Sequence, residues 1–95
     1  MVREAILAKL KNDPALQGLG VASLKLFGSA ARNTARPDSD ADFLVRFAGK
    51  PTFDRFMDLK LHLESVLEMK VDLVTEDALR PEMRHEVDRD ALLVA

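Results

Sequence analysis

The sequence predicts an α/β domain: a small mixed β-sheet of at least three strands, with helices packed mainly on one face. Short aliphatic runs at residues 21–27, 41–47 and 71–74 predict the strands, and amphipathic helical patterns separate them. The chain has 95 residues, the size of one domain, so we expect residues 1–95 to fold as a single unit. Hydrophobic residues make up 47% of the chain, which is enough for a core without disulfides.

The N-terminal segment predicts one helix followed by a loop. Apolar residues recur at helical spacing over residues 2–12. Asp13-Pro14 ends this helix, because the residue before a proline avoids the α conformation. Gly18 and Gly20 then predict a loop that leads into the first strand.

The second half of the chain predicts two further helices around the third strand. Apolar residues form a stripe over residues 53–68, and Thr52 is positioned as the N-cap of that helix. Thr75 can cap the turn after the third strand. Pro81 suits the first position of the last helix, where its missing N–H costs nothing.

Composition and charge exclude several classes of function. The chain has no cysteine, which rules out disulfides, a thiolate metal site and a cysteine nucleophile, and suits a reducing cytoplasm. The net charge of −2 argues against direct nucleic-acid binding, which usually needs a basic surface. No apolar run approaches the ~20 residues of a membrane span, and the N-terminus does not resemble a signal peptide.

Gly28-Ser29 follows the first strand directly and is the first candidate site. A strand that ends in Gly-Ser and turns into a helix directs backbone N–H groups at whatever lies in front of it. Glycine permits close approach, and the serine hydroxyl adds a donor. The pair suits a phosphate chain, although an isolated Gly-Ser after a strand is usually an ordinary turn.

Three aspartates form the second candidate site. Asp40 and Asp42 stand at the start of the second strand, where alternation puts residues i and i+2 on one face. Their carboxylates can converge on hard cations, as in two-metal phosphoryl-transfer sites; the alternative is a solvated pair that caps a turn. Asp72, inside the third strand, can complete a metal cage or act as a general base, or it can face solvent on an edge strand.

Together these residues resemble a known family. Gly28 and Ser29, ten intervening residues, the Asp40-x-Asp42 pair and the later Asp72 are similar to the motif of nucleotidyltransferases built on the polymerase β palm. The length of the chain and the VDLV strand make it most similar to the minimal nucleotidyltransferases (MNT). The resemblance covers about residues 21–74 and implies a palm-like fold over the single domain.

The resemblance implies a role for each motif residue. Gly28 and Ser29 would bind the β- and γ-phosphates of a nucleoside triphosphate, most simply ATP. Arg32 would add a phosphate contact or, equally well, be a solvated surface arginine. Asp40, Asp42 and Asp72 would ligate two Mg²⁺ ions, and Asp72 would also help to deprotonate the attacking hydroxyl. AMP would be transferred and pyrophosphate would leave. Lys25 and Arg36 are weaker candidates for a phosphate contact.

The chain departs from the family pattern at three positions. The family often has Gly-Ser-Arg-Ala-Arg-Gly, where this chain has Ala30 in place of the first arginine and Asn33 in place of the last glycine. Ala41 replaces a bulkier aliphatic residue between the metal-binding acids. The change at position 30 removes a cation near the expected phosphates, whereas all three acids are present.

The resemblance also implies a partner. Many minimal nucleotidyltransferases are antitoxins that adenylylate an all-helical HEPN toxin, so a hydroxyl of such a protein is the leading acceptor. Two alternatives are an antitoxin that neutralises its partner by binding alone, and a transferase with a small-molecule acceptor. Phe53 and Phe56, spaced i, i+3, either pack onto the sheet or form a docking patch for the partner.

The remaining candidate side chains have simpler interpretations. We expect His62 and His85 to be structural or exposed, because neither has a metal-type ligand at useful spacing. The glutamates of the last two helices, Glu64, Glu68, Glu82 and Glu86, are expected to be solvated.

Overall fold

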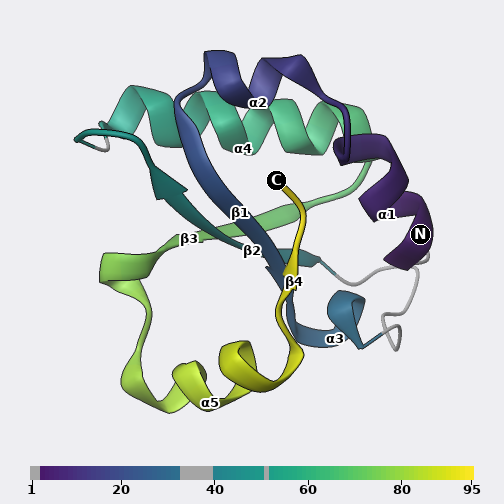
Figure 1. The fold of residues 1–95 in the computed structure, drawn as a ribbon, viewed down its shortest axis with the longest axis vertical. Coiled ribbons are helices and arrows are strands. Elements are labelled where there is room, and N and C mark those ends of the chain that lie inside the picture. Colours follow the sequence, from purple (N-terminus) through teal and green to yellow (C-terminus); the bar gives the residue numbers. More distant parts are fainter. Residues whose placement is uncertain (1–2, 33–39, 51) are drawn as a thin grey trace.

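The computed structural model of the chain describes residues 3–32, 40–50 and 52–95. Its elements are shown in Figure 1. In chain order they are α1 (Arg3–Leu10), α2 (Pro14–Gly18), β1 (Val21–Phe27), α3 (Gly28–Ala31), β2 (Ala41–Phe47), α4 (Phe53–Leu67), β3 (Val71–Thr75), the 3₁₀ turn η1 (Glu76–Ala78), α5 (Pro81–Asp90) and β4 (Leu92–Leu93).

The strands form one mixed sheet in the order β3-β2-β1-β4. β1 is antiparallel to β2 and to β4, whereas β2 and β3 are parallel. The α/β prediction and the three predicted strands are therefore confirmed. β4 was not predicted, because two residues carry no alternation; backbone hydrogen bonds between Leu24 and Val94 and between Leu24 and Ala95 extend its pairing.

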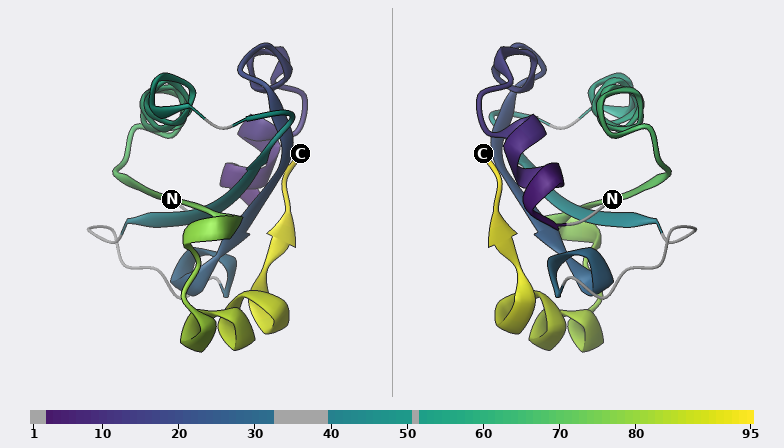
Figure 2. Two further views of the ribbon diagram at one scale, coloured as in Figure 1. Left: turned by 90° about the vertical axis from the view of Figure 1, so that its left-hand side faces the viewer. Right: turned by 90° about the vertical axis from the view of Figure 1, so that its right-hand side faces the viewer.

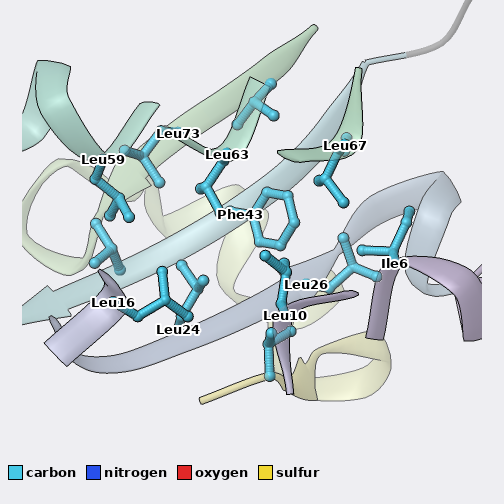
Figure 3. Close-up of a cluster of buried hydrophobic side chains, with 14 of the residues drawn as sticks. Ile6, Leu10, Leu16, Leu24, Leu26, Phe43, Leu59, Leu63, Leu67 and Leu73 are labelled. Carbon is cyan, nitrogen blue, oxygen red and sulfur yellow. The ribbon is translucent and has the colours of Figure 1, made fainter. Parts of the chain in front are cut away.

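The main core lies between one face of the sheet and helices α1, α2 and α4. Figure 3 shows aliphatic side chains of these helices converging on Phe43 of β2, which is fully buried. Burying side chains of this size contributes roughly 1.5–3 kcal/mol each to folding. The largest fully buried members are Ile6, Leu10, Leu24, Leu26, Phe43, Val45, Leu59, Leu63 and Leu67.

A second, smaller core lies on the opposite face of the sheet. Leu44, which alternates with Phe43 along β2, packs with Phe27, Leu79 and Val87. Val87 comes from α5, so this helix covers the face that the other helices leave open. Figure 2 shows α4 and α5 far apart, with the strands between them. The expectation of helices mainly on one face holds for α1, α2 and α4.

Residues 14–18, expected as a loop, form the short helix α2. Asp13 is its N-cap and accepts a hydrogen bond from the Ala15 N–H at 3.0 Å, and Pro14 occupies the first turn. The Asp-Pro pair that ends α1 thus also starts a new helix. Thr52 caps α4 as predicted, by accepting from the Arg55 N–H at 3.1 Å. Within the described residues, no helix is long and apolar enough to cross a bilayer.

Candidate active site

The Gly28-Ser29 turn lies where β1 ends and α3 begins. Gly28 has φ +72°, a left-handed conformation that L side chains rarely adopt, and it is buried. A Cβ at this position would overlap Oδ2 of Asp42 and lie 3.2 Å from its Cγ. Glycine is therefore required here for the backbone conformation and for the space that the neighbouring carboxylate occupies.

The parallel pairing of β2 and β3 brings two predicted acids side by side. Asp42 and Asp72 are register partners, and residues directly opposite on neighbouring strands share a face of the sheet about 4.8 Å apart. Asp42 is also the register partner of Phe27, the residue before the Gly-Ser turn. The turn, Asp42 and Asp72 thus form one continuous row across three elements.

Asp40 lies just before β2 and is exposed. It is close enough for its charge to act on Asp42. Among residues 3–32, 40–50 and 52–95, no three acidic or histidine side chains already stand together as a metal cage. Like-charged carboxylates repel one another, which disfavours a close cluster of three ionised carboxylates.

Asp42 is the titratable group most altered by this arrangement. Burial raises its pKa to about 6, and the negative charges of Asp72, Asp40 and Glu86 act in the same direction, whereas Arg32 opposes them. A carboxylate that is half-buried among other acids is costly to ionise unless a cation compensates it. Perturbed acids of this kind concentrate at functional sites.

Arg32, the predicted phosphate contact, follows α3 and is bound to α5. Its Nη1 donates to Glu86 Oε1 at 3.0 Å and to Asp90 Oδ2 at 2.9 Å. These two charge-assisted bonds raise the pKa of the Arg32 guanidinium further above its ordinary value. The side chain is 38% exposed, so water also reaches this cluster.

Glu86 and Asp90 were missed by the sequence analysis. Glu86 was expected to be solvated, but it binds Arg32 and its charge reaches Asp42. Glu64 was also expected to be solvated and instead accepts a hydrogen bond from the Val71 N–H at 3.1 Å. The spacing of residues 86 and 90 is the available signal, since i and i+4 on a helix can hold one cation together.

A groove of about 460 Å³ opens beside Asp72. Its walls are largely apolar and come from α4, β3, η1, the residues after η1 and the first turn of α5. The lining residues are Phe56, Asp72, Leu73, Val74, Thr75, Ala78, Arg80 and Met83. A carboxylate at the edge of an apolar groove can meet a polar group carried on a hydrophobic side chain.

The remaining predicted residues are placed as follows. Ala30 is 2% exposed and packs in the main core, so the position that lacks the family's arginine faces hydrophobic neighbours. Lys25 lies within β1 and makes no described contact with the three acids. Asn33 and Arg36 lie outside the described residues.

The histidines and phenylalanines also have clear positions. His62 is structural, as predicted: its Nε2 lies 2.6 Å from Asp13 Oδ2, and His85 is exposed. Phe53 is 76% exposed, so it does not pack onto the sheet. Phe56 is partly buried against the main core.

Comparison with known proteins places the chain in a family. The model of the polymerase β nucleotidyltransferase family matches residues 5–95. Protein adenylyltransferase MntA of Thermococcus cleftensis is 35% identical over 91 residues, which are 96% of this chain and 91% of that protein. A protein of Methanocaldococcus jannaschii assigned as a protein adenylyltransferase is 38% identical over 85 residues, 88% of this chain and 90% of that protein.

Solved structures share the fold. One assigned to the minimal nucleotidyltransferases has a TM-score of 0.73 and 40% identity, and the match covers 95% of this chain and 86% of that one. A toxin–antitoxin structure with AMP-PNP (TM-score 0.69, 24% identity, 100% and 73% covered) has the same fold. A chain in the structure of a tri-AMPylated Shewanella oneidensis HEPN toxin in complex with MNT antitoxin also shares the fold (TM-score 0.60, 22% identity, 98% and 68% covered). The chain belongs to the polymerase β-like nucleotidyltransferases and, within them, to the protein adenylyltransferases related to MntA.

Proposed function

We propose that this chain transfers AMP from ATP to a hydroxyl group of a HEPN-type toxin and thereby acts as its antitoxin. The observation that carries the proposal is the row formed by the Gly28 turn, Asp42 and Asp72. It combines a left-handed glycine turn, packed against the Asp42 carboxylate, with paired carboxylates on adjoining strands. The relatedness to MntA supports the protein acceptor.

The triphosphate would lie in front of the Gly28-Ser29 turn. Gly28 gives the turn its left-handed conformation, and backbone N–H groups of the turn can donate to phosphate oxygens. Ser29 would add its hydroxyl, and Arg32 would add a guanidinium that suits phosphate oxygens. These residues orient the α-phosphate toward the acids.

The carboxylates of Asp40, Asp42 and Asp72 are suitable ligands for Mg²⁺. Asp42 is half-buried with a raised pKa and two acidic neighbours, which is the setting in which a divalent cation relieves the most repulsion. We propose that Asp40, Asp42 and Asp72 hold two such ions, since carboxylate oxygens are the ligands magnesium prefers. When bound, Mg²⁺ would neutralise charge that develops on the phosphate oxygens.

In the proposed transfer step, Asp72 accepts the proton of the acceptor hydroxyl. The acceptor hydroxyl oxygen attacks the α-phosphorus, and a new P–O bond forms while the bond from that phosphorus to the bridging oxygen of pyrophosphate breaks. The hydroxyl proton passes to the carboxylate of Asp72, which acts as the general base. Pyrophosphate leaves from the side of Gly28 and Ser29.

The acceptor would enter through the groove beside Asp72. The groove is open to solvent along β3, and Phe53 is exposed at the start of α4, the helix that supplies Phe56 to the groove wall. A folded partner can cover this region and present its hydroxyl to the carboxylate. The reaction needs ATP and Mg²⁺, which the cytoplasm supplies.

Intact mass measurement tests the proposal. The chain is incubated with the HEPN-type protein of its own genome, ATP and Mg²⁺, and both proteins are weighed. The expected result is a toxin heavier by one or more AMP groups, lost toxin activity and no mass gain with Asp42→Asn. Neutralisation without a mass gain would support an antitoxin that acts by binding alone. Label on a small molecule and none on the toxin would support the small-molecule alternative.

A further inference from the structure

The ion pairs between Arg32 and α5 connect the phosphate turn to the last helix. Arg32 directly follows α3, the short helix that Gly28 and Ser29 begin. Its Nη1 is held by Glu86 and Asp90, one turn apart on α5, at 3.0 and 2.9 Å. The Asp90 carboxylate is 13% exposed and is also bound by Arg89. A residue expected to meet phosphate is thus already engaged by two carboxylates.

The charges around this contact are unbalanced. The negative charges of Asp40, Asp72 and Glu86 all act on Asp42, and the positive charge of Arg32 opposes them there. A triphosphate would add more negative charge at the same place. Each carboxylate on Arg32 therefore weakens the attraction that this guanidinium can offer to a phosphate.

We propose that Glu86 and Asp90 compete with the triphosphate for Arg32, so that α5 sets the nucleotide affinity and is released from α3 when nucleotide binds. This inference rests on the proposed function, because it assigns a regulatory role at the same site. Glu86 acts through Arg32 and is a positioning residue. When nucleotide binds, a phosphate oxygen would replace the Glu86 carboxylate oxygen as the acceptor on the Arg32 guanidinium, so one oxyanion replaces another.

The release of α5 would also affect the groove beside Asp72, where we expect the acceptor to bind. Met83, in the first turn of α5, lines the groove beside Asp72, and Arg80 precedes that helix in the same wall. Helix α5 therefore joins the proposed nucleotide contact near its C-terminal end to the groove that we assign to the acceptor at its N-terminal end.

Nucleotide binding to four variants tests the competition. The affinity for AMP-PNP with Mg²⁺ is measured for the wild type, Glu86→Gln, Arg32→Gln and the double variant. Glu82→Gln is the matched control, because it removes the same charge one turn earlier on α5 from an exposed side chain. Thermal melts check that each variant is folded.

The expected result is that Glu86→Gln tightens binding by about threefold or more relative to Glu82→Gln. In the Arg32→Gln background the same change should have no larger effect than the control. Weaker or unchanged binding by Glu86→Gln would overturn the inference, as would equal tightening in the absence of Arg32, which would indicate general repulsion. Absence of AMP-PNP binding by the folded wild type would instead contradict the proposed function.

Discussion

Gly28 leaves open the space that the Asp42 carboxylate occupies. Gly28 directly follows β1 and Asp42 lies near the start of β2, and a methyl group on Gly28 would overlap Oδ2 of Asp42. The same glycine has φ +72°. Gly28 thus satisfies a conformational requirement of the turn and leaves room for the Asp42 carboxylate, and this links the proposed phosphate-binding turn to a proposed metal ligand.

Replacing Gly28 should therefore impair stability as well as nucleotide binding. We expect Gly28→Ala to destabilise the fold by about 2–4 kcal/mol, because the left-handed conformation and the contact with Asp42 both penalise a Cβ. Urea unfolding measures the change. In an Asp42→Ala background the loss should be smaller, since only the conformational part remains; an equal loss in both backgrounds would show that the contact is unimportant.

Asp42→Asn should abolish AMP transfer and leave the fold intact or slightly more stable. The wild-type pKa of about 6 means that ionised Asp42 is disfavoured in the folded state. Because the folded pKa lies above the unfolded one, Asp42 costs stability increasingly as the pH rises from about 4 to 6. Melting temperatures in EDTA at pH 4.5 and 7.5 test this, and the difference between wild type and variant should be larger at pH 7.5.

Ser29→Ala should weaken ATP binding by about 1–2 kcal/mol, which is the scale of one hydrogen bond to a charged group. The hydroxyl would donate to a phosphate oxygen, and alanine fills a similar volume without that donor. Titration with AMP-PNP measures the effect. Ser23→Ala, on the preceding strand, is the control, and an equal loss of affinity in both variants would place the nucleotide elsewhere.

The hydrogen bond between His62 and Asp13 should make the free energy of unfolding fall at low pH. It lowers the pKa of the Asp13 carboxyl below its ordinary value, with help from the Ala15 N–H. Because the folded pKa is depressed, the stabilisation is present above the unfolded pKa of about 4 and is lost as the pH falls through the folded pKa. Urea unfolding between pH 2.5 and 6 should show a shallower acid loss for His62→Ala than for wild type.

Substitutions of the two phenylalanines of α4 should distinguish an effect on partner binding from an effect on folding stability. Phe53→Ala should change stability by less than about 0.5 kcal/mol, because the ring is 76% exposed, and should weaken the toxin complex by about 1–3 kcal/mol. Phe56→Ala should instead cost about 2–4 kcal/mol of stability, since its ring packs against the main core. Thermal melts and a binding titration measure both. Unchanged affinity of Phe53→Ala would remove this residue from the interface.

The sequence by itself predicted the elements whose signals are local. Strands β1 and β2 have the predicted bounds, because alternation and β-forming residues mark them, and α4 begins after its Thr52 cap. Gly28, Asp40, Asp42 and Asp72 were assigned to one site because their spacing resembles the motif of a family, and their roles stay predictions. Local signals failed at α2, where the Asp-Pro pair that ends one helix starts another.

Only the tertiary structure decided which of these residues meet. Asp42 and Asp72 are partners because β2 and β3 pair in parallel at one register, which no local pattern specifies. Arg32 binds Glu86 and Asp90, 54 and 58 positions away, because α5 packs over the second face of the sheet. Contacts across such separations follow from how helices and strands bury their apolar faces together, and the charges on those elements are brought together by that packing.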